Sequence, residues 1–245
     1  MRLLAFLFSV SFLGMASARA ADVLYIGDSH SYGCFGETLD KSMRAMKTNT
    51  GRAITVRSGA TCGSSAASWL AAKGHETTCG YRACTVNNTC SKSTKGHSDS
   101  AEKLMQEESP KMTVVALGSN MLKRGPLAAM TDVHILIGKI KAQHSECVWI
   151  GPPQPALFFQ RAEAYQAFNE RLRSTVEGGG CRFILSDDKT SRENLRDTMG
   201  LHYDCANGTR WAEKVMKELR PLLKMGTSPS TSARGGRAAT TATKP

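Results

Sequence analysis

Four short segments of the chain carry the kinds of group that acyl-transfer chemistry requires. They supply a hydroxyl at Ser29, an imidazole at His202, a side-chain amide at Asn120 and a glycine backbone at Gly63. A serine hydroxyl becomes a nucleophile when an imidazole takes its proton, and the oxyanion formed on the attacked carbonyl needs fixed hydrogen-bond donors. Each residue alone also has an ordinary explanation: a helix cap, a turn glycine or a structural histidine. Their positions relative to the expected strands favour a shared site.

Short β-rich runs alternate with helix-like stretches along most of the chain. Ala162, Tyr165, Phe168 and Leu172, for example, have the spacing of one apolar helical face. This alternation predicts an α/β fold, with a parallel sheet and helices on both faces. The expected strands are 23–26, 53–56, 113–117, 148–150 and 183–185, and the expected helices lie around 36–47, 64–73, 100–108, 127–143, 161–176 and 209–224.

The four chemical groups follow the ends of these elements. Reactive groups in an open parallel sheet collect where strands end and loops turn into helices. The first strand runs into the segment that contains Ser29, the second into 58–64 and the third into 117–120, while 197–203 precedes the last helix. We therefore expect all four groups at one edge of the sheet.

This ordered set resembles the motif blocks of the SGNH, or GDSL-like, hydrolase superfamily. Gly27-Asp28-Ser29 resembles the first block, with His30 where many members have Leu. The other three blocks are matched by Cys62-Gly63, Gly118-Ser119-Asn120 and Gly200-Leu201-His202. By order and spacing the resemblance covers most of residues 22–224. It implies a flavodoxin-like three-layer α/β/α sandwich with a five-stranded parallel sheet, and hydrolysis of esters or thioesters.

The same resemblance assigns a role to each group. Ser29 is the expected nucleophile and His202 its general base. The backbone N–H groups of Ser29 and Gly63 and the side-chain amide of Asn120 form the expected oxyanion hole. We expect no metal and no organic cofactor.

The acid that orients the histidine departs from the family pattern. The usual last block has Asp three residues before the histidine, but Met199 stands there. Asp197 is our candidate for this acid. The alternatives are a serine–histidine dyad without a carboxylate, or one of Asp187, Asp188 and Asp204.

The two ends of the chain differ from its middle. Residues 1–20 have the charged start, apolar run and small-residue cleavage site of a signal peptide. Residues 226–245 lack aromatic and large aliphatic side chains, so we expect a disordered tail. Between them, residues 21–225 form the expected hydrolase domain, with a Cys-rich insertion at about 74–98. We expect an exported, periplasmic or secreted protein without a transmembrane segment.

The eight cysteines of an exported chain indicate disulfide bonds. Eight cysteines allow 105 pairings, so their pattern is left open. A metal site is the alternative, since Cys79, Cys84 and Cys90 lie near His75 and His97, but the chain has no CxxC pair.

One disulfide can nevertheless be predicted from the layout of the strands. Cys147 and Cys181 each open an expected strand, and neighbouring parallel strands begin side by side, so we predict that they pair. Cys34, Cys62 and Cys205 lie close to three segments of the expected site, where disulfides could clamp the loops. A nucleophilic cysteine is the alternative.

The formal net charge of +11 falls to +6 for residues 21–225, because five of the basic residues lie in the terminal segments. Such a charge permits binding to anionic envelope polymers, but no basic run is interleaved with aromatic residues, so we expect no nucleic-acid partner. The turn Gly27-Asp28-Ser29-His30, followed by Gly33 and Phe35, resembles the envelope-glycan acetylesterases of the superfamily. This resemblance implies an exported serine esterase that removes short acyl groups, such as O-acetyl groups, from a cell-envelope glycan, and we expect a monomer. The alternatives are a catalytically degenerate glycan binder, a thioesterase or lysophospholipase of the same superfamily, and, from charge alone, a polyanion-binding protein.

Overall fold

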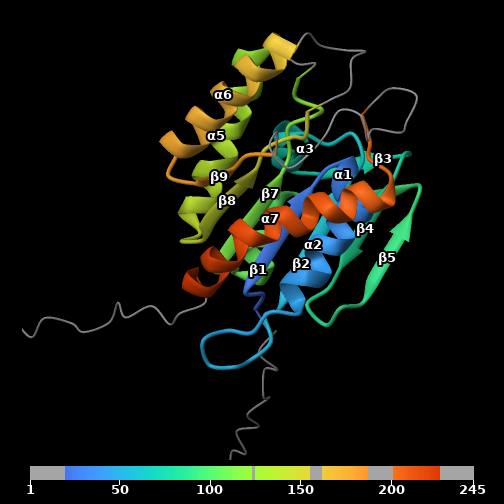
Figure 1. Cartoon of the computed structure of the whole chain (residues 1–245), viewed down its shortest axis with the longest axis vertical. Helices are drawn as coiled ribbons and strands as arrows, with labels where there is room; N and C mark the ends of the chain where they lie inside the picture. The colour runs from blue at the N-terminus through green and yellow to red at the C-terminus, as the bar shows by residue number, and fades with distance from the viewer. Residues whose placement is uncertain (1–19, 123–124, 155–161, 187–200, 227–245) are drawn as a thin grey trace, which may run out of the picture.

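A seven-stranded, mainly parallel sheet forms the central layer of the protein in a computed structural model, which describes residues 20–122, 125–154, 162–186 and 201–226 (Figure 1). The strand order is β5-β4-β2-β1-β7-β8-β9. The five parallel strands, in chain order, are β1 (Val23–Gly27), β2 (Val56–Thr61), β7 (Met112–Ala116), β8 (Glu146–Ile150) and β9 (Arg182–Ile184). Numbered along the chain, these five follow the order 2-1-3-4-5, which is the flavodoxin-like order. The predicted three-layer α/β fold is confirmed.

Helices cover both faces of this sheet (Figure 1). One face packs against α3 (Ala66–Leu70), α4 (Ala101–Glu108), α5 (Pro126–Ala142) and α6 (Ala162–Gly178). The other packs against α2 (Cys34–Arg44) and α7 (Cys205–Gly226), which lie side by side although they are far apart in sequence. Because helices exclude water from both faces, β1 and β7 are buried at every position, as is typical of parallel strands.

The sheet has seven strands rather than the five predicted. The two additional strands, β4 (Tyr81–Cys84) and β5 (Cys90–Ser93), form a hairpin that pairs antiparallel with β2. They come from the segment expected as an insertion, which also forms a two-stranded sheet from β3 (His75–Thr77) and β6 (Gly96–Ser98). The free edge of β2 offers unpaired backbone groups, and the hairpin satisfies them.

The second parallel strand also begins later than predicted, at Val56 instead of residue 53. Val23 pairs with Val56 and Gly27 with Ala60, so β1 determines where β2 lies. The end of the strand extends to Thr61 because residues 58–60 have neighbours on both sides and Thr61 pairs with Tyr81 of β4.

The predicted disulfide between Cys147 and Cys181 is confirmed. Cys147 lies in β8, and Cys181 directly precedes β9, its neighbour in the sheet. None of the described helices combines the length and apolarity needed to span a bilayer. The expected signal peptide, except for Ala20, and the expected tail, except for residue 226, lie outside the described residues.

Candidate active site

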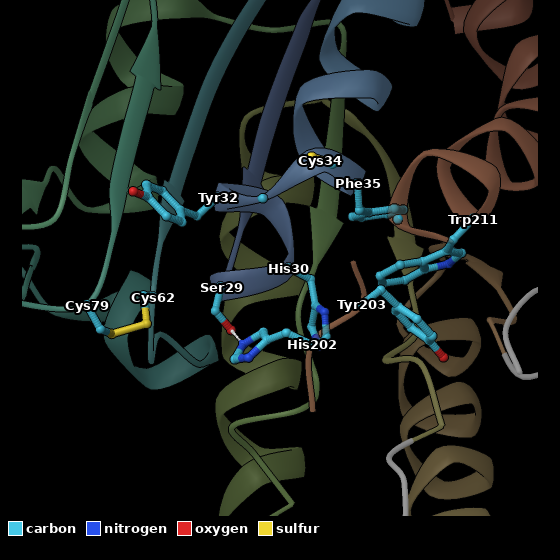
Figure 2. Close-up of a pocket in the computed structure, with 12 residues that line it drawn as sticks. Ser29, His30, Tyr32, Cys34, Phe35, Cys62, Cys79, His202, Tyr203 and Trp211 are labelled. Atoms are coloured by element: carbon cyan, nitrogen blue, oxygen red, sulfur yellow. Dashed lines mark hydrogen bonds between the residues drawn. A yellow bond between two sulfur atoms is a disulfide. The ribbon is translucent and has the colours of Figure 1, made fainter. Parts of the chain in front are cut away.

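Ser29 and His202 meet at the edge of the sheet where β1 ends (Figure 2). The Ser29 Oγ and the His202 Nε2 are 2.8 Å apart, although the two residues are separated by 173 positions in the sequence. Ser29 is the first residue of the short helix α1 (Ser29–Tyr32), and His202 lies in the loop before α7. This edge is also the switch point of the topology, because the chain continues from β1 to β2 on one side and later to β7 on the other.

The turn that presents Ser29 is packed too tightly for most side chains. A Cβ added to Gly27 would collide with the side chain of Ser31. Ser31 is fully buried, and its Oγ accepts a hydrogen bond of 2.7 Å from the Tyr25 hydroxyl in β1. The glycine therefore allows α1 to lie directly against the end of the strand, which fixes the position of Ser29.

Asp28 caps α1 from a buried position beside the candidate nucleophile. Its carboxylate accepts the backbone N–H of His30 at 3.0 Å. Burial raises the pKa of Asp28 from 3.8 to about 7, while the hydrogen bond from the His30 backbone partly opposes this rise. Burial thus favours the neutral form of the Asp28 carboxyl.

Gly63 and Asn120 lie in the two loops that flank this turn. Gly63 has a φ of +80°, a conformation in which glycine is not strained. The Asn120 side chain donates one hydrogen bond to the Ser64 carbonyl at 3.0 Å, which ties its loop to the Gly63 loop. An amide nitrogen carries two hydrogens, so Asn120 retains a second donor. Within the described part of the chain, the backbone N–H groups of Ser29 and Gly63 have no acceptor.

His202 has an aromatic neighbour in His30. Its ring centroid lies 5.1 Å from that of His30, and the His30 ring meets Trp211 edge-on at 5.4 Å.

Asp204, one of the alternatives for the orienting acid, accepts the backbone N–H of Asn207 at 2.8 Å and so caps α7. Four other residues that bear on this acid lie outside the described residues, namely Asp187, Asp188, Asp197 and Met199.

Two disulfides hold the loops of this site together, and Figure 2 shows one of them, Cys62–Cys79. Cys34–Cys205 joins the start of α2 to the start of α7, and so connects the chain just after Ser29 to the chain just after His202. Cys62–Cys79 joins the Gly63 loop to the segment between β3 and β4. The expected clamps are therefore present.

All eight cysteines are paired, the fourth pair being Cys84–Cys90. This pairing contradicts the alternative of a nucleophilic cysteine, because a disulfide sulfur is not a thiolate. It also removes the cysteine ligands of the alternative metal site, since Cys79, Cys84 and Cys90 are all in disulfides.

A cavity of about 250 Å³ opens beside the Ser29–His202 pair. Its walls include aromatic residues that the sequence analysis did not assign to the site: Tyr32, Phe35, Tyr203 and Trp211 (Figure 2). Phe35 and Trp211 stack with their centroids 3.6 Å apart, and so join α2 to α7 in the wall of the cavity. Both have the spacing of ordinary core positions of their helices, so no local signal marked them as lining residues.

Comparison with solved structures finds the same fold in a putative hydrolase and in esterases. A putative SGNH hydrolase from Slackia heliotrinireducens has a TM-score of 0.52 and 19% identity over 82% of this chain and 98% of its own. A family 3 carbohydrate esterase from Clostridium thermocellum has a TM-score of 0.58 and 12% identity over 86% of this chain and 100% of its own. A catalytic mutant of Axe2, an acetylxylan esterase from Geobacillus stearothermophilus, has a TM-score of 0.58 and 11% identity over 82% of this chain and 94% of its own.

Sequence comparison finds no matching family model and no matching curated protein. The structural likeness at these low identities concerns the fold. The fold is that of the SGNH hydrolases, as the motif blocks led us to expect.

Proposed function

We propose that the protein is a serine esterase of the SGNH type. The observation that carries this proposal is the 2.8 Å contact between the Ser29 Oγ and the His202 Nε2 at the wall of a cavity. A serine and a histidine in this arrangement form a nucleophile and its general base. Two unengaged backbone N–H groups and the Asn120 amide lie in the neighbouring loops, where an oxyanion hole is needed.

Acylation begins when the Ser29 oxygen attacks the ester carbonyl carbon and its proton moves to the His202 Nε2. The carbonyl oxygen becomes an oxyanion that accepts hydrogen bonds from the Ser29 and Gly63 N–H groups and the Asn120 amide. Collapse of this intermediate breaks the bond to the alkoxy oxygen, which leaves as an alcohol with the proton from His202. An acyl-serine remains.

Deacylation repeats these steps with water. His202 takes a proton from water as the water oxygen attacks the acyl carbonyl, and the same donors stabilise the second oxyanion. The bond to the Ser29 oxygen then breaks, the proton returns to Ser29, and the carboxylic acid is released. We assign the role of orienting His202 to Asp197, because it lies two residues before the position of the usual acid, and Asp204, which caps α7 through one carboxylate oxygen, is the alternative.

The proposed substrate is a short acyl ester, such as an O-acetyl group, on a cell-envelope glycan. The cavity beside Ser29, at about 250 Å³, is small compared with the ~300–1,000 Å³ of typical ligand pockets, which favours a short acyl group. Two structural neighbours are a carbohydrate esterase and an acetylxylan esterase. Four disulfides favour an oxidising compartment and hence an exported protein.

A glycan-binding protein without catalysis is the second candidate, because Met199 occupies the position of the usual acid. The Ser29–His202 contact favours the enzyme, since binding alone requires no imidazole on the serine oxygen. A thioesterase or lysophospholipase would use the same groups and would differ in the acyl chain and leaving group that it accepts.

A fluorophosphonate probe tests the proposal without the natural substrate. It phosphonylates an activated serine with loss of fluoride, and intact-mass analysis of the oxidised protein reports the adduct. We expect one adduct on the native chain, none on Ser29→Ala and one on the control Ser91→Ala, which changes an exposed serine of β5. The absence of an adduct on folded native protein would contradict the esterase and favour the glycan binder.

A further inference from the structure

A second cavity, of about 370 Å³, lies between α2 and the β4–β5 hairpin. Its basic lining consists of Lys41 and Arg44 from α2 and Arg82 and Lys92 from the hairpin. We name this cavity, with these four residues and the two acids described below, the α2–hairpin groove. Its hairpin wall is held by the Cys84–Cys90 disulfide, so the groove is built on braced elements.

The groove contains more positive charge than its own acids neutralise. Its acids are Asp40, which pairs with Arg44 at 2.9 Å and Arg82 at 3.2 Å, and Glu37, which pairs with Lys92 at 2.5 Å. Four basic residues therefore face two carboxylates.

Lys41 and Arg82 carry the positively charged donor groups of the groove that are not fully paired with its two carboxylates. Lys41 is exposed and has no ion-pair partner among the described residues. Arg82 is only 5% exposed, and its Nη1 is buried with no acceptor in the described part of the chain. A buried charged donor without an acceptor is costly, and Arg82 therefore leaves uncompensated positive charge in the wall of the groove, which favours an anion there.

The groove adjoins the cavity beside Ser29. Tyr32, three residues after Ser29, lies in the wall of that cavity, and the Lys92 Nζ is 4.8 Å from the centroid of its ring. A Cβ on Gly80 would come within 2.8 Å of this ring, so Tyr32 packs closely against the Gly80 backbone as well as near Lys92. One extended ligand can therefore contact both cavities across the Tyr32–Lys92 pair.

We propose that the α2–hairpin groove binds an anionic group, a carboxylate or a phosphate, on the glycan that carries the scissile ester. This inference rests on the proposed esterase function and specifies its substrate as an acidic glycan. Lysine and arginine donors bind both kinds of anion. Because the groove lies next to the cavity beside Ser29, the anion it binds belongs to the polymer whose ester reaches Ser29. The hairpin outside the parallel sheet thus supplies half of a substrate-binding surface.

Binding of unesterified polymers tests the groove independently of hydrolysis. Isothermal titration of the native chain would compare dextran oligomers that are neutral, carboxymethylated or phosphorylated, at low and at raised NaCl concentration. We expect the anionic oligomers to bind at least ~10-fold more tightly than the neutral one at low salt, with the difference shrinking as salt rises. The more tightly bound anion identifies the group, and equal affinities identify a site for both.

Matched lysine variants locate the binding. Lys41→Gln should weaken binding of the anionic oligomers about fivefold, as expected for the loss of one partly solvated ion pair. Lys95→Gln removes the same charge from an exposed position outside the groove and should leave the affinity unchanged. Equal losses in the two variants, or equal binding of neutral and anionic oligomers, would overturn the proposal.

The link to the active site has its own readout. An anionic oligomer that spans both cavities should slow fluorophosphonate labelling of Ser29 in proportion to its occupancy. If the bound oligomer leaves the labelling rate unchanged, the groove does not serve the ester substrate. If no serine is labelled but the anionic oligomers bind selectively, the esterase function fails while the anion site stands.

Discussion

The disulfide Cys34–Cys205 should contribute more to both stability and reactivity than any other cross-link of the chain. It closes a sequence separation of 171 residues, whereas Cys84–Cys90 closes one of 6. The loop-entropy relation gives about 5 kcal/mol for the first and about 2 kcal/mol for the second. Replacing both cysteines of each pair by serine should therefore lower the free energy of unfolding by amounts that differ by about 3 kcal/mol.

The effect on reactivity follows from where the cross-link lies. Cys34 is five residues after Ser29, and Cys205 is three residues after His202, so the bond limits how far the two loops can separate. Urea unfolding would measure the free energy of unfolding. The rate of fluorophosphonate labelling of Ser29 would measure the fraction of molecules in which His202 lies within hydrogen-bond distance of the Ser29 oxygen. We expect slower labelling in Cys34→Ser/Cys205→Ser and native labelling in Cys84→Ser/Cys90→Ser.

Two outcomes would refute this reasoning. Equal stability losses in the two double variants would show that loop length does not govern the contribution of these bonds. Native labelling in the folded Cys34→Ser/Cys205→Ser variant would show that the packing of α2 against α7, including the stacked Phe35 and Trp211, positions Ser29 and His202 without the bond.

Three further predictions concern single side chains. In the native protein, the pKa of Asp28 is raised from 3.8 in the unfolded chain to about 7, so ionisation of Asp28 should lower the free energy of unfolding by up to about 4 kcal/mol as the pH rises from about 4 to 8. Asp28→Asn keeps the acceptor for the His30 N–H but cannot titrate, so this fall should be absent from the variant. Urea unfolding across this pH range would measure it, and an equally steep fall in the variant would contradict the prediction. Asn120→Ala should lower kcat for p-nitrophenyl acetate about 10²–10³-fold through the loss of an oxyanion donor, and native turnover would exclude that role. Asp197→Ala should lower kcat strongly with the fold intact, whereas Asp204→Ala should mainly destabilise α7; the reverse pattern would transfer the orienting role to Asp204.

Much of the fold could be predicted because local patterns specify it. The five parallel strands are apolar runs between helical repeats, and burial of Tyr165, Phe168 and Leu172 confirms the helical face predicted from their spacing. The Cys147–Cys181 bond was predictable for a related reason, since the order of the strands makes their starting points neighbours.

The candidate site was only partly visible in the sequence. Ser29, Gly63 and Asn120 follow strand ends, so their shared edge follows from the topology of a parallel sheet. Tyr32 and Trp211 gave no such signal, because an aromatic residue on a helix is ordinarily a core residue. They line the cavity only because α1 and α7 meet there.

The sequence by itself therefore determined the alternation of strands and helices, the order of the chemical groups along the sheet edge and the number of cysteines. Only the tertiary structure decided which cysteines pair at the site, that the β4–β5 hairpin extends the sheet, and that Arg82 and Lys41 face a common groove. The physical reason is the range of the interactions. Periodicity and turn chemistry act over a few residues, whereas the Ser29–His202 contact and the Cys34–Cys205 bond join segments more than 170 residues apart, whose distance depends on how every intervening element packs.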